Sequence, residues 1–147
     1  EAARASQEMI GECLRAKCDP NDVENLVTKT LGVVQESGIY AGALFLLSRT
    51  RKLDQQIAGA VQPKLVALAR SVTGIAAPLP NANAPREALS YVSSNFCQSI
   101  ETMFLVKDLW EQTLIYARYA AKAESEAAKA RKAAEKEAAA KDATPPR

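Results

Sequence analysis

Ten consecutive uncharged residues, 38–47, constrain the fold of this chain more than any other stretch. The run is too short to cross a bilayer, which needs about 20 apolar residues. At the helical period its large side chains point to more than one side, so we expect a helix enclosed on most faces. Arg49, Arg51 and Lys52 follow directly, where cations suit the C-terminal end of a helix dipole. We therefore predict a central helix that carries a basic cluster to the surface of a small helical domain.

The rest of the chain also reads as helix, and no strand pattern appears. The clearest helical pattern covers residues 23–34, after a start at Asp19-Pro20, and we expect it to end at Gly38 in a left-handed cap. A further helix begins near Asp54, a possible cap, and Pro63 either bends or restarts it before Gly74. The sequence predicts an all-α, single-domain bundle of five to six helices.

Residues 75–85 form the one obvious loop, with three prolines, two asparagines and no charge, and we expect it to be exposed and mobile. A long helical pattern follows, with a bend near residues 93–95. It carries two apolar stripes, so it must contact two neighbours, either both within the domain or one in a partner chain. The first stripe is Phe96, Ile100, Met103, Trp110, Leu114 and Ala117, and the second is Leu105, Leu109, Tyr116 and Tyr119.

The amino-acid composition of the chain changes after residue 119. Residues 120–141 contain no apolar side chain larger than Ala, among Lys, Arg and Glu. Ala, Lys and Glu favour helix, but such a segment has no face to bury. We therefore predict a bundle domain over residues 1–119 and a charged, Ala-rich tail over 120–147, either a projecting helix or disordered.

Positive charge is concentrated in the middle of the chain. The formal net charge is only +2, yet residues 49–86 contain six basic residues and a single acidic one. A one-sided basic surface suits phosphate contacts, which set affinity without reading sequence. The alternative is a solvated face that happens to be rich in Lys and Arg. The candidate nucleic-acid-binding residues are Arg49, Arg51, Lys52, Lys64 and Arg70.

The sequence gives little support for an enzyme, a phosphate-loop protein or a zinc-binding protein. The chain has no His, the commonest general base near neutral pH, and no Gly-rich phosphate loop. Its three cysteines do not make a zinc ligand set, and we expect Cys13 and Cys97 to be small core residues, reduced in a cytoplasm. We expect no catalytic residue, no metal, no cofactor, no signal peptide and no membrane span.

One segment resembles a known family. Residues 33–49 read Val-Val-Gln-Glu-Ser-Gly-Ile-Tyr-Ala-Gly-Ala-Leu-Phe-Leu-Leu-Ser-Arg. This resembles the small α-helical subunit of type III-B (Cmr) CRISPR effector complexes, in which an apolar helix ends at Asn-Gly and a helix reading roughly Leu-x-Gln-Ala-Leu-Ala-Phe-Leu-Leu-Ser-Lys follows. Tyr91 and Trp110 are similar to a downstream pair in that family. The family's Gln is replaced by Ala41 or Gly42, and the tail after residue 119 is not part of its pattern.

The resemblance implies a non-catalytic subunit of an RNA-guided antiviral ribonucleoprotein. Members of the family stack along the backbone of the complex and contact guide and target RNA through basic side chains. The expected partners are other subunits of the complex and the RNA backbone, with self-association possible. The alternative is a helical protein–protein adaptor with no nucleic-acid role, in which residues 86–141 form a long helix that docks a partner.

Overall fold

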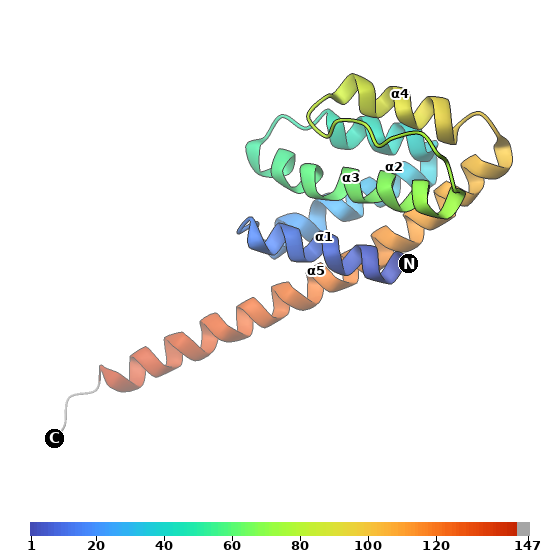
Figure 1. The fold of residues 1–147 in the computed structure, drawn as a ribbon. Coiled ribbons are helices and arrows are strands. Elements are labelled where there is room, and N and C mark those ends of the chain that lie inside the picture. Colours follow the sequence, from blue (N-terminus) through green and yellow to red (C-terminus); the bar gives the residue numbers. More distant parts are fainter. Residues whose placement is uncertain (144–147) are drawn as a thin grey trace.

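The computed structural model of the chain describes residues 1–143. Within them the chain forms five α-helices and no strand, which confirms the predicted all-α fold. The helices are α1 (Ala2–Arg15), α2 (Pro20–Leu47), α3 (Lys52–Thr73), α4 (Pro85–Phe96) and α5 (Ile100–Asp142). Figure 1 shows a bundle of α1–α4 and the first half of α5, while the rest of α5 projects away from it. Residues 144–147 of the predicted tail lie outside the described residues.

Helix α1 ends in a two-bond C-terminal motif. Cys18 donates its backbone N–H to the carbonyl of Cys13, and Lys17 donates to the carbonyl of Leu14. In this arrangement, a Schellman motif, the backbone of Lys17 itself lies in the left-handed region, with φ 58°. Glycine is the usual residue there, because a Cβ is strained at positive φ. The side chains of Cys13 and Cys18, on either side of this turn, are both buried in the core.

Helix α2 begins as the sequence predicts and bends where a break is expected. Asp19 caps it by accepting the N–H of Asn21 at 2.8 Å, and Pro20 occupies the first turn. At Gly38 the backbone leaves the helical region, with φ 87° and ψ −176°, and the helix resumes at once. The two segments are therefore joined across a kink, rather than separated by a left-handed cap.

Gly42 allows a close contact between the two segments of α2 on either side of the kink. A Cβ at Gly42 would lie 2.4 Å from Cγ2 of Val34, which belongs to the segment before the kink. Val34 is fully buried, so the bend brings its branched side chain against bare backbone.

Helix α3 runs through Pro63 as one element and ends at Gly74 in the left-handed conformation, with φ 69°. Pro63 therefore neither ends nor restarts the helix. Asp54 is not the cap, because the helix begins at Lys52 with Arg51 at the N-cap position. Asp54 instead lies in the first turn, where a negative charge suits the helix dipole.

The loop after α3 is attached to the bundle. The carbonyl of Ala77 accepts the Arg70 Nε–H at 2.8 Å and the Tyr91 hydroxyl at 3.1 Å. Ile75 and Ala77 pack against the core, so this half of the loop is less exposed than the sequence suggests. The predicted bend near residues 93–95 lies slightly later, between Phe96 and Ile100, and Ser99 caps α5 there.

Helix α5 is the element that the rest of the bundle packs against. It lies along both α1 and α2. Trp110 is buried and donates its indole N–H to the carbonyl of Leu65 in α3 at 2.9 Å. Packing continues beyond residue 119, because Ala121 and Ser125 are buried and Ser125 donates to the side chain of Asn21 at 2.6 Å. The expectation that the tail buries no face was wrong for this first part, and the segment beyond it is exposed helix.

Helix α2 also bears on the membrane question. Among the described residues it alone is long and apolar enough to cross a membrane by length and composition, with a mean hydropathy of 1.3 over an 18-residue window. The sequence-based expectation that no stretch qualifies was wrong on this measure. In the structure α2 is kinked at Gly38 and packs along α5, and 39% of the window is buried. A core helix of a soluble protein passes the same test.

Candidate functional site

The predicted basic residues begin at the turn between α2 and α3. The guanidinium of Arg49 lies over the ring of Phe45, with Cζ 3.9 Å from the ring centroid. Its Nε donates to the Phe45 carbonyl at 2.9 Å, which ties the side chain to the last turn of α2. Such a contact orders the cation and leaves it without a carboxylate partner among the described residues.

Arg51 is held by two carboxylates. Its Nη2 lies 2.9 Å from Asp22 of α2 and 3.0 Å from Asp54 of α3. The hydrogen bonds that Arg51 donates to Asp22 and Asp54 raise the pKa of Arg51 above its ordinary value. Together with Lys29 and Arg49, these residues line a groove of about 340 Å³ between α2 and α3. Its three cations and two carboxylates make it much less positive than the sequence predicts.

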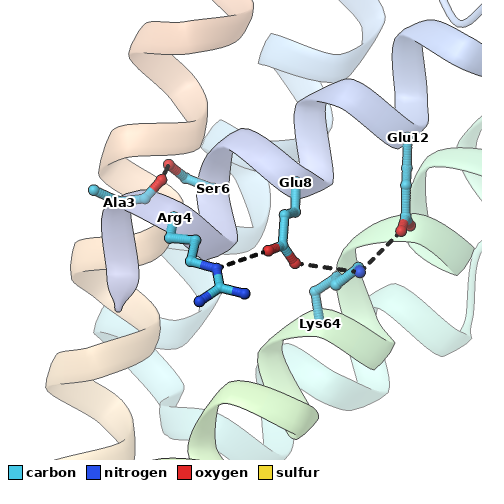
Figure 2. Close-up of polar contacts among 6 residues, drawn as sticks. All are labelled: Ala3, Arg4, Ser6, Glu8, Glu12 and Lys64. Atoms are coloured by element: carbon cyan, nitrogen blue, oxygen red, sulfur yellow. Dashed lines mark hydrogen bonds and ion pairs between the residues drawn. The ribbon is translucent and has the colours of Figure 1, made fainter.

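Lys64 is paired with two carboxylates of the neighbouring helix α1. Figure 2 shows it extending from α3 toward α1, where its Nζ lies 2.9 Å from Glu12 and 3.5 Å from Glu8. Arg4 holds the other oxygen of Glu8 at 3.1 Å. The hydrogen bond to Glu12 raises the pKa of Lys64, and Arg4 followed by Lys64 lowers the pKa of Glu8. Lys64 therefore joins α3 to α1.

The five predicted residues do not converge on one surface. Arg49, Arg51 and Lys52 cluster at the α2–α3 turn. Arg70 is near the other end of α3, roughly 27 Å from Lys52 along the helix axis, and is hydrogen bonded to the loop. Within the described part of the chain, only Lys52 among the five has an exposed side chain without a hydrogen bond or ion pair. The candidate RNA-binding cluster is thus reduced to Lys52 and Arg49.

A second surface stands out instead, on the outer side of α5. Nine large apolar side chains are exposed among the described residues, and five belong to the first part of this helix. They are Ile100, Phe104, Leu105, Tyr116 and Tyr119, with exposed fractions between 41 and 70%. The signal was present in the sequence, because four of these five belong to the predicted stripes, three of them to the second stripe. Three of the four residues of the second stripe are therefore exposed, and the fourth, Leu109, is half-buried.

The cysteines and carboxylates offer little chemistry. Burial raises the pKa of Cys13 to about 12, so its thiol stays protonated and unreactive at neutral pH. All three cysteines are free thiols. Within residues 1–143 no three His, Cys, Asp or Glu side chains are placed to hold a metal ion.

Comparison with protein-family models, with curated proteins and with solved structures finds no match to this chain. The resemblance to the small subunit of Cmr complexes therefore stays a prediction. So does the choice between an RNA-contacting subunit and a protein–protein adaptor.

Proposed function

We propose that this protein is a non-catalytic, cytoplasmic helical subunit of a multiprotein assembly and that it binds its neighbour through the outer face of α5. The exposed apolar side chains of that face carry the proposal, because water-exposed Phe104, Leu105 and Tyr119 on one helix are typical of an interface. Tyr119 is 62% exposed and Phe104 55%. Both the effector-complex and the adaptor interpretations share this role.

The test is a substitution that places a charge on the face without disturbing the core. Leu105 is 48% exposed, so Leu105→Arg should leave the stability of the bundle nearly unchanged while it removes binding. Val72 of α3 is 41% exposed and provides the matched control, Val72→Arg. The tagged chain is expressed in cells of its source organism, and the proteins that co-purify with it are compared. We expect these proteins to be lost with Leu105→Arg and retained with Val72→Arg. Equal recovery with both variants would contradict the proposal.

A second candidate function is RNA contact within a type III CRISPR effector complex. The specific observation in its favour is that Arg49 and Lys52 have no carboxylate partner within the described residues, although three other basic candidates are bound internally. Replacing Arg51 would also break its contacts with Asp22 and Asp54, so a loss of binding would be ambiguous. Lys52→Glu is the cleaner variant.

RNA binding can be measured by fluorescence anisotropy with single-stranded and duplex RNA at low and high salt. If Lys52 and Arg49 contact phosphates, affinity falls as salt rises, and Lys52→Glu weakens binding to all sequences alike. The matched control is Lys136→Glu on the part of α5 that projects from the bundle, which should leave binding unchanged. Absence of binding at low salt would contradict RNA contact by the isolated chain. It would not affect the proposal that the chain binds a partner through α5.

A further inference from the structure

We propose that the outer face of α5 binds a second copy of this chain, with the two α5 helices antiparallel and crossing at Gln112. The inference rests on the proposed function, since it names the partner of the same face. It is argued from three properties of that face: an unbroken exposed stripe, its symmetry about one residue, and the opposite charges of its two halves.

The stripe is continuous along about six turns of helix. Its members recur every three or four residues, so they lie within roughly 80° of arc on one side of α5. Every one of them is exposed. They are Glu101, Leu105, Asp108, Gln112, Tyr116, Tyr119 and Ala123. The buried residues Val106, Trp110 and Ala117 lie on the opposite side, against the bundle.

The stripe is nearly symmetric about Gln112. Leu105 and Tyr119 each lie seven residues from it, and Asp108 and Tyr116 each lie four. An antiparallel pair that crosses at Gln112 therefore places Leu105 against the partner's Tyr119 at both ends. It also places the Tyr116 hydroxyl beside the partner's Asp108, to which it can donate. This is the reciprocal pattern of a two-fold interface, in which two different residues contact each other twice.

The two halves of the segment carry opposite charge. Residues 100–111 contain Glu101, Asp108 and Glu111 and one base, Lys107, which forms an ion pair with Glu111. Residues 112–123 contain Arg118 and Lys122 and no acid. An antiparallel pair sets the acidic half of each helix against the basic half of the other, with Glu101 near the partner's Lys122. A parallel pair sets like charges together, which is unfavourable.

The size of the contact predicts a weak dimer. From residue 101 to residue 123 the stripe is roughly 33 Å long, and a helix pair is about 10 Å wide at its contact. The resulting footprint is roughly 350 Å² per chain, against about 800 Å² in standard stable interfaces. We therefore expect a monomer–dimer equilibrium in the micromolar range, rather than an obligate dimer.

The first experiment is sedimentation equilibrium of the full chain between about 5 and 500 μM, a range chosen to bracket a weak interface. We expect the wild type and Val72→Arg to shift from monomer to dimer with the same midpoint, and Leu105→Arg to remain monomeric. Circular dichroism of each variant checks that the bundle is folded. A wild type that stays monomeric throughout, or a dimer that Leu105→Arg leaves intact, would overturn the inference.

The direction of pairing is tested by crosslinking in a Cys97→Ser background. Glu101 and Ala123 are equidistant from Gln112 and exposed, so the double variant Glu101→Cys/Ala123→Cys should form a covalent dimer with a short bismaleimide. Ala123→Cys alone should not, because the two copies of residue 123 would lie about 33 Å apart. A covalent dimer from Ala123→Cys alone would indicate a parallel pair and overturn the antiparallel arrangement.

Charge reversal gives an independent check. Glu101→Lys and Lys122→Glu should each weaken the homodimer, whereas the double variant should recover it, because the two opposite charges again face each other with their positions exchanged. A double variant as weak as the singles would count against the pairing. If the chain proves monomeric but other proteins still depend on Leu105 for co-purification, the self-association fails while the proposed function stands. If neither occurs, both fail.

Discussion

The kink at Gly38 makes a sharp prediction about stability. With φ 87° and ψ −176°, the residue occupies a region that is almost exclusive to glycine, and a Cβ there would meet no atom within 4 Å. The cost of Gly38→Ala is therefore backbone strain and not a clash. Strain of this kind costs about 1–3 kcal/mol. Straightening of α2 would not relieve this strain without cost, because it would move Ile39, Ala43 and Leu46, which are buried in the core after the kink.

Gly32 is the matched control, since it lies in the same helix and a Cβ there also meets nothing within 4 Å. Its backbone is helical, so Gly32→Ala should stabilise the protein by about 0.5–1 kcal/mol. Urea unfolding followed by circular dichroism at 222 nm measures both variants. We expect the midpoint to fall for Gly38→Ala and to rise for Gly32→Ala, with a difference of about 2–4 kcal/mol in free energy of unfolding. A Gly38→Ala variant as stable as Gly32→Ala would refute the kink.

Three further predictions follow from local geometry. Lys17→Gly should stabilise the protein by about 1 kcal/mol, because it removes the strain of a side chain at positive φ, and a urea midpoint that falls would contradict this. Gln62 is buried, and its Nε2 has no hydrogen-bond partner in the described structure, so Gln62→Leu should also raise the urea midpoint, by about 1 kcal/mol. Lys64→Gln should destabilise the protein at pH 7 more than at pH 3, since the lowered pKa of Glu8 contributes stability at neutral pH that is lost as pH falls through that pKa; equal losses at both pH values would argue against the ion pair.

Much of the fold was predictable because its signals are local. Pro20 and Gly74 mark helix ends through their own backbone preferences, and Gly38 marks the bend in α2 for the same reason. Pro63 shows the limit of this reasoning. Its ring favours a break, yet Val61 and Leu65 on either side of it are buried, and α3 continues through it. Tertiary packing of an apolar face outweighs the preference of one residue.

The candidate site was less predictable, because its charges pair across long distances in the sequence. Arg51 meets Asp22 of α2, which is 29 residues away, and Lys64 hydrogen bonds to Glu8, 56 residues away. In the sequence, Glu8 and Asp22 lie in the N-terminal part of the chain, far from the basic residues of 49–86. The distribution of charge along the chain therefore did not predict that they pair. Packing of α1 and α2 against α3 brings them together, and Arg51 and Lys64 of the predicted basic surface are neutralised by carboxylates.

The sequence by itself determined that this chain is helical, where α2 begins and where α3 ends, and that the long C-terminal helix has two apolar stripes. Only the tertiary structure decided which stripe is buried, which cations are free, and that the bundle extends to Ser125. The physical reason is the range of the interactions. Backbone preference and periodicity act within a few residues, whereas burial and ion pairing depend on which helix faces meet. Leu105 and Tyr119 remain exposed in the bundle, and this is why we propose that the chain binds its partner there.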